Sequence, residues 1–316
     1  MSLKVGMVIV TYNRKDKLVN VLANIDKQSA APSVVVIVDN HSTDGTDEIL
    51  SKWAAKTKIK NIIHRTESNL GGSGGFSKGV ELALKQDIDW MYLGDDDAYP
   101  NLDLIEKFSN FIKGQGESAK GIASVCATVD SPDGISLFHR RSIKKTFYKV
   151  EEIDSTKEDY KKDFFEINLF SFVGVFLNKT MVEKIGLPRS DFFIWYDDSE
   201  YSLRINKLGK NLCVPSLVVY HDSPTMEADE LSWKTYYGFR NKFETNRLAI
   251  GKFRTSIFAK AKLAKFKHQY KKAKKANAEN SRNKELLYYV LKDAIYDYKH
   301  HKFGISEKYK PGTKLM

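Results

Sequence analysis

The sequence predicts an α/β fold that carries a helical, basic region at its C-terminal end. Strand-like and helix-like segments alternate over residues 5–129, which is typical of βαβ units and a mainly parallel sheet. Beyond residue 233 the apolar residues recur at helical spacing instead. The 316 residues, of which 42% are hydrophobic, are enough for one sizeable domain with its own core plus an appendage.

The elements of the first half follow from runs and spacings of apolar residues. Strands are expected at residues 5–10, 34–38, 62–63, 90–93 and 122–129. Helices are expected where Leu18, Leu22 and Ile25 recur, at residues 80–83 after a glycine-rich stretch, and at 102–112. Ligands of such sheets lie beyond the carboxyl ends of the strands, and polar clusters follow the first four strands. This edge is the expected site.

The second half has a weaker pattern. Residues 131–163 are charged and weakly periodic, which predicts a long loop or lid. Order is expected again over 167–177, with a helix at 179–185, a helix that carries Leu203, Ile205 and Leu208, and a strand at 217–220.

The chain ends in a predicted helix with one apolar stripe. The stripe consists of Leu286, Leu287, Val290, Leu291, Ala294, Ile295 and Tyr298. We therefore expect two parts, a catalytic domain at residues 1–225 and a helical, basic region at 226–316.

The net charge of +11 is confined to this last region. Residues 252–302 contain 15 Lys and Arg against 4 Asp and Glu, so the rest of the chain has 36 of each sign. Such a block is typical of a segment that binds nucleic acid or an anionic membrane surface, and a solvated helical face explains it equally well.

The two cysteines and the hydropathy pattern indicate a compartment. Cys126 and Cys213 lack the spacing of a disulfide scaffold or a zinc site, which favours a reducing, cytoplasmic environment. No apolar run approaches the ~18 residues needed to span a bilayer. The first residues also lack the pattern of a signal peptide, so neither secretion nor membrane spanning is expected.

Asp95, Asp96 and Asp97 form the strongest local signal, because they follow a predicted strand directly. Adjacent carboxylates repel one another unless a cation neutralises them, and a divalent ion bound to a diphosphate suits such oxygens. Asp95 and Asp97 would point to the same side of an extended chain and share one ion. An exposed acidic turn before Pro100 is the alternative.

The glycine-rich stretch at residues 69–76 lacks the spacing of a dinucleotide-binding loop or a P-loop. Its glycines are expected to let the backbone approach a nucleotide or turn tightly.

Four motifs in order give the sequence a family resemblance. They are Val8-Ile-Val-Thr-Tyr-Asn-Arg14, Val36-Ile-Val-Asp-Asn-His-Ser-Thr-Asp-Gly45, Asn69-Leu-Gly-Gly-Ser-Gly-Gly-Phe76 and Leu93-Gly-Asp-Asp-Asp-Ala98. Together they resemble family 2 glycosyltransferases, which are inverting enzymes of the GT-A fold. Trp195-Tyr-Asp-Asp-Ser-Glu-Tyr-Ser-Leu-Arg204 and the aromatic segment that ends in Arg240-Asn241 are most similar to bacterial galactofuranosyltransferases and related rhamnosyltransferases.

The resemblance implies a binding site for a nucleotide sugar and a metal ion. The nucleotide-sugar residues would be Thr11, Asn13, Arg14, Asp39, Asn69, Gly74, Gly75, Asp95 and Asp96. Asp95, Asp97 and His221 would hold Mg2+ or Mn2+, which would stabilise the departing nucleotide as a Lewis acid. Taken alone, His221 is more typical of a packed or surface imidazole, and its place at a strand end favours the metal site.

Further residues are implied for the acceptor. Trp195 and Tyr196 would stack on a sugar or else pack in the core, and Arg240 would contact an acceptor pyrophosphate or else remain solvated. Asp197 is expected beside the acceptor and as the N-cap of the following helix, with Glu200 three residues later. Asp198 is then free to act as the general base.

The function implied is inverting transfer of a hexose, with galactofuranose from its UDP form as the first choice. Transfer of rhamnose from dTDP-rhamnose is the alternative enzyme, and a non-catalytic partner that binds nucleotide sugars is the alternative outside catalysis. The acceptor would be a lipid-linked glycan precursor at the cytoplasmic leaflet. The basic region would bind the anionic membrane surface rather than nucleic acid, because it contains no recognisable nucleic-acid-binding module. Association into a homo-oligomer is left open.

Overall fold

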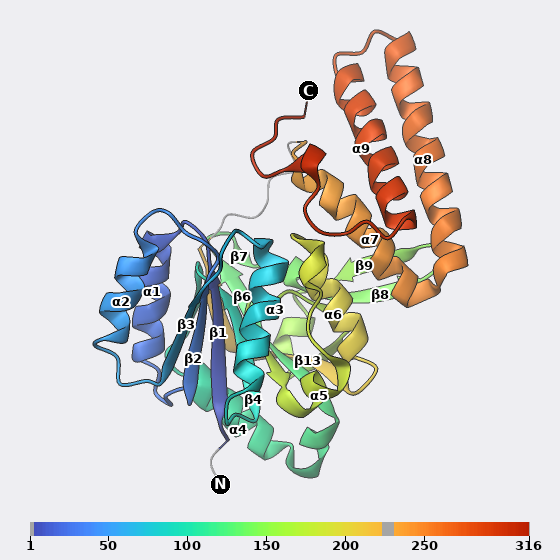
Figure 1. Ribbon diagram of the computed structural model, residues 1–316. Coiled ribbons are helices and arrows are strands. Elements are labelled where there is room, and N and C mark those ends of the chain that lie inside the picture. The colour runs from blue at the N-terminus through green and yellow to red at the C-terminus, as the bar shows by residue number, and fades with distance from the viewer. Residues whose placement is uncertain (1–2, 223–230, 316) are drawn as a thin grey trace.

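The computed structural model describes residues 3–222 and 231–315 (Figure 1). The predicted α/β class is confirmed, because a central sheet is covered by helices and three further helices stand beside it. The expected boundary at 225/226 lies outside the described residues.

Four parallel strands form one half of the sheet in the order β4-β1-β2-β3. They are β1 (Val5–Thr11), β2 (Val34–Asp39), β3 (Asn61–Arg65) and β4 (Trp90–Asp95). Every residue of β1 and β2 is buried. Burial on both faces explains why these strands are continuous apolar runs without alternation.

Helices cover both faces of this half. They are α1 (Lys15–Asp26), α2 (Thr46–Ala54), α3 (Gly71–Leu84) and α4 (Leu104–Gly114). Met7 and Ile9 of β1 belong to the core beneath α1, α2 and α4, whereas Val8 and Val10 belong to the core beneath α3. The sheet therefore separates two apolar layers, and its carboxyl edge remains at the surface for a site.

The other half of the sheet mixes strand directions. Its strands are β5 (Ala98–Pro100), β6 (Ile122–Ser131), β7 (Gly134–Ile135), β10 (Phe165–Ile167), β12 (Val175–Asn178) and β13 (Lys210–His221). Strand β12 is antiparallel to both β4 and β6, whereas β13 is parallel to β6. The strand predicted at 217–220 is thus the last part of a longer strand.

Two helices belong to this half, α5 (Lys179–Ile185) and α6 (Asp197–Ile205). The predicted α6 is confirmed, but Leu208 lies in the turn after it, where its side chain is exposed. Short 3-10 helices lie at Gly116–Gly121, Leu137–His139, Asp159–Lys161, Ser190–Phe192 and Glu307–Tyr309.

The prediction of a long loop or lid at 131–163 is wrong. This segment forms β8 (Arg140–Lys145) and β9 (Val150–Asp154), which join β11 (Leu169–Phe170) in a second sheet of order β11-β8-β9. The fully buried Arg140 donates hydrogen bonds to the carbonyl oxygens of Ala127 at 3.0 Å and Val173 at 2.7 Å. Polar contacts of this kind fix the segment, so its sequence has no apolar period.

The C-terminal region consists of α7 (Lys234–Ile250), α8 (Lys252–Lys275) and α9 (Ser281–Lys299). In Figure 1, α8 and α9 form an orange-red hairpin that extends away from the sheet. Five residues of the predicted apolar stripe, Val290, Leu291, Ala294, Ile295 and Tyr298, are confirmed as the buried face of α9 that packs on α7 and α8, whereas Leu286 and Leu287 are only half-buried. Among the described helices, none combines the length and hydropathy needed to cross a membrane.

Candidate active site

A cavity of about 740 Å³ lies at the carboxyl ends of β4 and β13 and extends to α6, α7 and α8. Cavities of about 300–1,000 Å³ are typical of small-molecule sites. Seven of the predicted site residues line it, namely Arg14, Asp95, Asp97, Trp195, Tyr196, Asp198 and His221. The cavity therefore lies at the edge of the sheet where the site was predicted.

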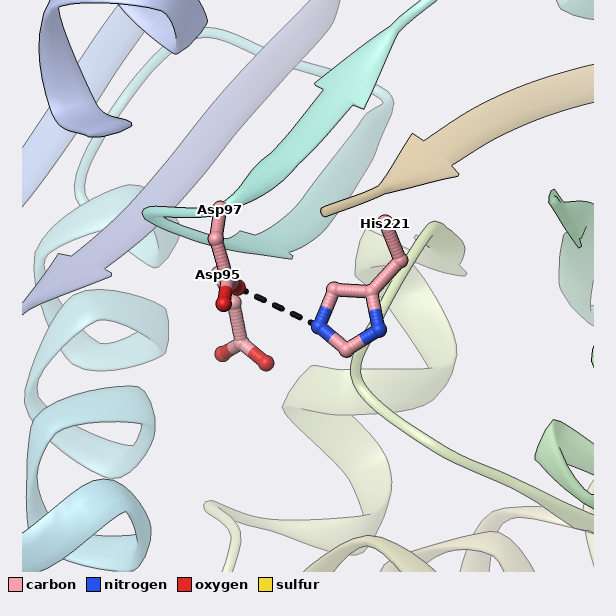
Figure 2. Close-up of side chains that lie close together, drawn as sticks. All are labelled: Asp95, Asp97 and His221. Carbon is pink, nitrogen blue, oxygen red and sulfur yellow. Dashed lines mark ion pairs between the residues drawn. The ribbon is translucent and has the colours of Figure 1, made fainter. Parts of the chain in front are cut away.

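Asp95, Asp97 and His221 meet because two strands pair beyond the end of β4. His221, the last residue of β13, lies opposite Ala98 of β5, which follows Asp97 directly. Figure 2 shows both carboxylates pointing to the same side, toward the imidazole ring. One ligand atom of each residue lies within 4.8 Å of the others, and His221 Nε2 is 3.2 Å from Asp97 Oδ1.

Burial and mutual repulsion perturb this triad. Burial raises the pKa of Asp95, and the charge of Asp97 raises it further. Burial lowers the pKa of His221, but the hydrogen bond that His221 donates to Asp97 and the charges of Asp97 and Asp95 together outweigh burial and hold the pKa above its ordinary value. A divalent cation would relieve the carboxylate repulsion, and carboxylate oxygens are the ligands that Mn2+ and Mg2+ prefer. The three residues fit a metal site.

Arg14 and Lys17 are cations beside the acidic turn, and the Lys17 ammonium lies 3.8 Å from Asp97. Arg14 is the one that lines the cavity. The Arg14 guanidinium pairs with Asp97 and lies 3.6 Å from Asp96. Burial raises the pKa of Asp96 to about 6, and Arg14 opposes this shift. The Asp96 carboxylate accepts a hydrogen bond from the Tyr12 backbone N–H at 3.2 Å, so this residue ties the acidic turn to the end of β1.

The predicted nucleotide residues Thr11, Asn13 and Asp39 gather at the ends of β1 and β2, outside the cavity lining. Asp39 is buried, and its carboxylate accepts hydrogen bonds from the Ser42 N–H and the Arg65 guanidinium, both at 2.8 Å. The Asn13 side chain accepts one from a backbone N–H of the loop after β2 at 2.7 Å. Their contact with a nucleotide stays a prediction.

Residues 71–76 of the glycine-rich stretch form the start of α3, and Asn69 and Leu70 precede the helix. The Asn69 side chain accepts a hydrogen bond from the Gly71 N–H at 2.8 Å, where the helix begins. A Cβ on Gly75 would lie 2.5 Å from a methyl group of Val10, and one on Gly74 would lie 2.5 Å from the Leu70 Cβ. Gly74 and Gly75 therefore allow close packing, and neither lines the cavity. Their contact with a nucleotide, like that of Thr11, Asn13 and Asp39, stays a prediction.

Trp195 and Tyr196 lie on a loop with unusual backbone geometry. Phe193, Trp195 and Tyr196 have φ angles of 66°, 65° and 69°, in a region that costs a non-glycine residue on the order of 1–3 kcal/mol. The side-chain amide of Asn241 donates hydrogen bonds to the carbonyl oxygens of residues 192, 194 and 195 at 3.0, 3.0 and 2.9 Å. Asn241 thus holds the loop that forms one wall of the cavity.

Arg240 is buried behind the same loop. It donates hydrogen bonds to the carbonyl oxygens of Gly304 at 2.8 Å and Phe192 at 3.1 Å, and its guanidinium lies 5.0 Å from the centre of the Tyr237 ring. The solvated alternative is wrong, because the Arg240 side chain is buried. Its contact with an acceptor stays a prediction.

The two carboxylates at the start of α6 differ in their surroundings. Asp198 lines the cavity and accepts a hydrogen bond from the Ser199 hydroxyl at 3.0 Å. Asp197 is buried outside the lining. Burial raises the pKa of both, the Asp198 charge adds to the shift of Asp197, and the Arg141 guanidinium opposes the shift of Asp198.

The predicted N-cap role of Asp197 is wrong. Helix α6 starts at Asp197 itself, and the preceding Tyr196 has a left-handed backbone and makes no side-chain cap. Glu200 pairs with Arg204 at 2.8 Å instead of reaching back to the helix start. A left-handed tyrosine is uncommon, so the sequence contained no sign that the cap position falls there.

Three basic residues of the cavity wall were not predicted, namely Arg141, Lys242 and Lys262. Arg141 donates to the Ser199 hydroxyl at 3.0 Å, and Lys242 pairs with Glu152 at 3.0 Å. The Lys262 ammonium lies 4.6 Å from the centre of the Phe239 ring. They come from β8, α7 and α8, where a single cation among many charged residues gives no local signal.

Comparison with known proteins gives one family match that covers more than half of the chain. The family model described as Glycosyl transferase family 2 matches residues 7–186. Galactofuranosyltransferase GlfT1 of Mycobacterium tuberculosis is 26% identical over 210 residues, which are 66% of this chain and 66% of the relative, just under two thirds.

Solved structures resemble the whole architecture. GalNAc-T7 with UDP, GalNAc and Mn2+ has a TM-score of 0.62 at 14% identity, over 95% of this chain and 58% of that one. The mannosyltransferase PcManGT of Pyrobaculum calidifontis, with GDP-Man and Mn2+, has a TM-score of 0.53 at 16% identity, over 96% of this chain and 88% of that one. These likenesses confirm the predicted GT-A fold.

Proposed function

The chain belongs to glycosyl transferase family 2, and on this premise we propose that it transfers galactofuranose from UDP-galactofuranose to a hydroxyl of a lipid-linked glycan, with inversion at the anomeric carbon. One observation carries the proposal. A single cavity is lined by the Asp95, Asp97 and His221 triad and by the separate carboxylate of Asp198. The similarity to galactofuranosyltransferase GlfT1 supports the choice of donor sugar.

The triad would hold Mg2+ or Mn2+, which would neutralise the donor diphosphate and the leaving nucleotide. Arg14 places a second positive charge beside the same carboxylates. Thr11, Asn13 and Asp39 would bind the base and ribose at the neighbouring strand ends, with Asn69 near the diphosphate. The donor would therefore lie along the carboxyl edge of the parallel strands, as is usual for open α/β sheets.

Asp198 would act as the general base. It would take the proton of the acceptor hydroxyl as that oxygen forms its bond to the anomeric carbon and the bond to the nucleotide diphosphate breaks. Burial moves the pKa of Asp198 upward, toward the range that suits a base near neutral pH. Trp195 and Tyr196 line the same cavity and offer aromatic surface to the acceptor sugar.

Nucleotide binding tests the donor side of this proposal. Thermal unfolding is measured with UDP, dTDP and GDP, each with and without Mn2+, because a ligand that binds the native state raises the midpoint. We expect UDP with Mn2+ to raise the unfolding midpoint most. In Asp97→Ala, addition of Mn2+ should not increase the shift that UDP causes. A larger midpoint shift with dTDP than with UDP would favour rhamnosyl transfer. An equal Mn2+-dependent shift in wild type and Asp97→Ala would refute the metal site.

Turnover tests the transfer itself. The enzyme is incubated with UDP-galactofuranose and Mn2+, and release of UDP is followed with and without lipid-linked glycan. We expect release that depends on the acceptor. A protein that binds UDP tightly but releases none from any donor would be the non-catalytic partner instead.

Helix α8 supports the proposed contact with an anionic membrane surface at the cytoplasmic leaflet. It contains ten Lys and Arg and no Asp or Glu, and Phe253 at its start is 73% exposed. Cations of this kind contribute up to about 1 kcal/mol each near anionic lipid. The acceptor proposed above is anchored in such a surface, so the contact would bring enzyme and acceptor together.

A further inference from the structure

The basic wall of the cavity contains more positive charge than its neighbours neutralise. Arg141 and Lys242 share one carboxylate, that of Glu152. Lys242 also lies 5.5 Å from the centre of the Tyr196 ring. Three cations of the lining thus face two carboxylates, those of Glu152 and Asp198, and among the described residues Lys262 pairs with neither.

Three aromatic rings surround the Lys262 ammonium. Its ammonium lies 4.6 Å from the centre of the Phe239 ring and 5.8 Å from those of Phe258 and Phe266. Within residues 3–222 and 231–315, no ion pair to Lys262 is found. Burial, together with the charges of Lys242 and Lys265, lowers the pKa of Lys262 to about 8. Lys262 is half-buried, and a partly desolvated cation without a counter-ion is costly, so an anionic ligand would lower this cost.

The basic wall lies on the same side as the proposed base. Arg141 donates to the Ser199 hydroxyl at 3.0 Å, which in turn donates to Asp198 at 3.0 Å. The donor diphosphate, by contrast, is assigned to the triad and Arg14. An anion bound by the basic wall would therefore accompany the molecule whose hydroxyl Asp198 deprotonates.

We propose that Arg141, Lys242 and Lys262 bind a phosphate or diphosphate group of the acceptor. This inference deepens the proposed function and rests on it, because only a transferase has an acceptor. The cations would fix the acceptor by its anionic group, while the neighbouring aromatic rings of Phe239 and Trp195 offer apolar surface. The specificity for the acceptor would then come from charge as well as from the sugar.

The test uses inorganic pyrophosphate as the probe, with the full chain in EDTA so that no metal ion bridges the probe to the triad. Calorimetric titration compares wild type with Lys262→Gln, and Lys260→Gln serves as the control because it removes an exposed charge from the same helix. We expect Lys262→Gln to weaken binding about tenfold, as for loss of one charge-assisted contact, and Lys260→Gln to leave it unchanged. Absence of binding to wild type, or equal binding by Lys262→Gln, would overturn the proposal.

Two further measurements separate this site from the donor site. Arg14→Gln should bind pyrophosphate in EDTA as wild type does, and Lys262→Gln should be stabilised by UDP with Mn2+ as wild type is. If Arg14→Gln lost the probe or Lys262→Gln lost UDP, the anion would occupy the donor site and the acceptor assignment would fall. Failure of the proposed function would show differently, as absence of nucleotide stabilisation in wild type itself.

Discussion

Asp198 and Asp197 are chemically identical neighbours, and their surroundings alone distinguish them. Asp198 lines the cavity and its carboxylate is held by Ser199, whereas Asp197 is buried outside the lining. A general base must reach the proton that it removes. The position of Asp198 meets that condition and the position of Asp197 does not.

We expect Asp198→Asn to lower turnover at least about 100-fold, since a general base contributes roughly 100- to 10,000-fold. Its affinity for UDP with Mn2+ should stay near that of wild type. Asp197→Asn should lose much less turnover, because the amide keeps the volume of a side chain that does not face the cavity. Steady-state assays and nucleotide titrations of both variants decide the assignment, and a nearly active Asp198→Asn would refute it.

The pH dependence of turnover follows from the groups around Asp198. Burial raises its pKa, the Arg141 guanidinium lowers it, and Glu152 raises it. A base works only when deprotonated, so activity is present above this pKa and is lost as the pH falls through it. Removing the guanidinium raises the pKa further. We therefore expect Arg141→Gln to move the acid limb of the kcat profile to higher pH, and an unmoved or lower limb would contradict the role of Asp198.

At the scale of elements, the loop between η4 (Ser190–Phe192) and α6 depends on one side chain of α7. Asn241 donates three hydrogen bonds to its carbonyl groups, and these offset the cost of three left-handed residues. Asn241→Asp keeps the shape but replaces the donor amide by an acceptor, so each contact becomes repulsive.

We expect Asn241→Asp to cost about 2–4 kcal/mol of stability and to lower kcat at least about tenfold. Asn283→Asp is the matched control, because this asparagine is exposed on α9. Thermal unfolding and turnover are measured for both variants. An Asn241→Asp enzyme with wild-type kcat would show that the loop needs no clamp.

The glycines of α3 give a second prediction at this scale. A Cβ on Gly75 would lie 2.5 Å from Val10, whereas one on Gly72 would meet nothing within 4 Å. Gly75→Ala should therefore destabilise the protein by about 1–3 kcal/mol through overpacking. Gly72→Ala should be neutral or stabilising, by up to about 1 kcal/mol, because alanine favours the helix. Chemical denaturation compares the two, and equal effects would refute the packing role.

The sequence could predict those elements and site residues that show up as a pattern in neighbouring residues. Strands buried on both faces appear as apolar runs, and the carboxylates after β4 reveal the triad because they follow such a run. The β8–β9 hairpin escaped prediction because a buried arginine and ion pairs fix it. The basic wall escaped because its members come from three distant elements, and only the packing of α7 and α8 brings them together.

At the scale of the whole molecule, the C-terminal helices form part of the site rather than a separate appendage. Val290 and Ala294 of α9 pack in one apolar cluster with Tyr236, Tyr237 and Phe193, and Phe193 begins the strained loop of the cavity. Lys242 and Lys262 of the cavity wall lie on α7 and α8. Deleting the chain from Lys252 would therefore disturb the site, so a test of membrane binding must keep the helices and change only their charge.

The variant for that test replaces four exposed lysines of α8 by glutamine, namely Lys267, Lys271, Lys272 and Lys275. We expect its affinity for liposomes with anionic lipid to fall at least about tenfold, since each cation near the surface contributes up to about 1 kcal/mol. The control variant replaces Lys52, Lys56, Lys58 and Lys113 by glutamine, which removes the same amount of charge from the α/β domain. Sedimentation with liposomes at low and high salt measures both, because salt screens charge attraction. An equal loss of liposome affinity in both variants would mean that binding depends only on the net charge of the protein. Unchanged affinity in the α8 variant would mean that another part of the protein contacts the membrane.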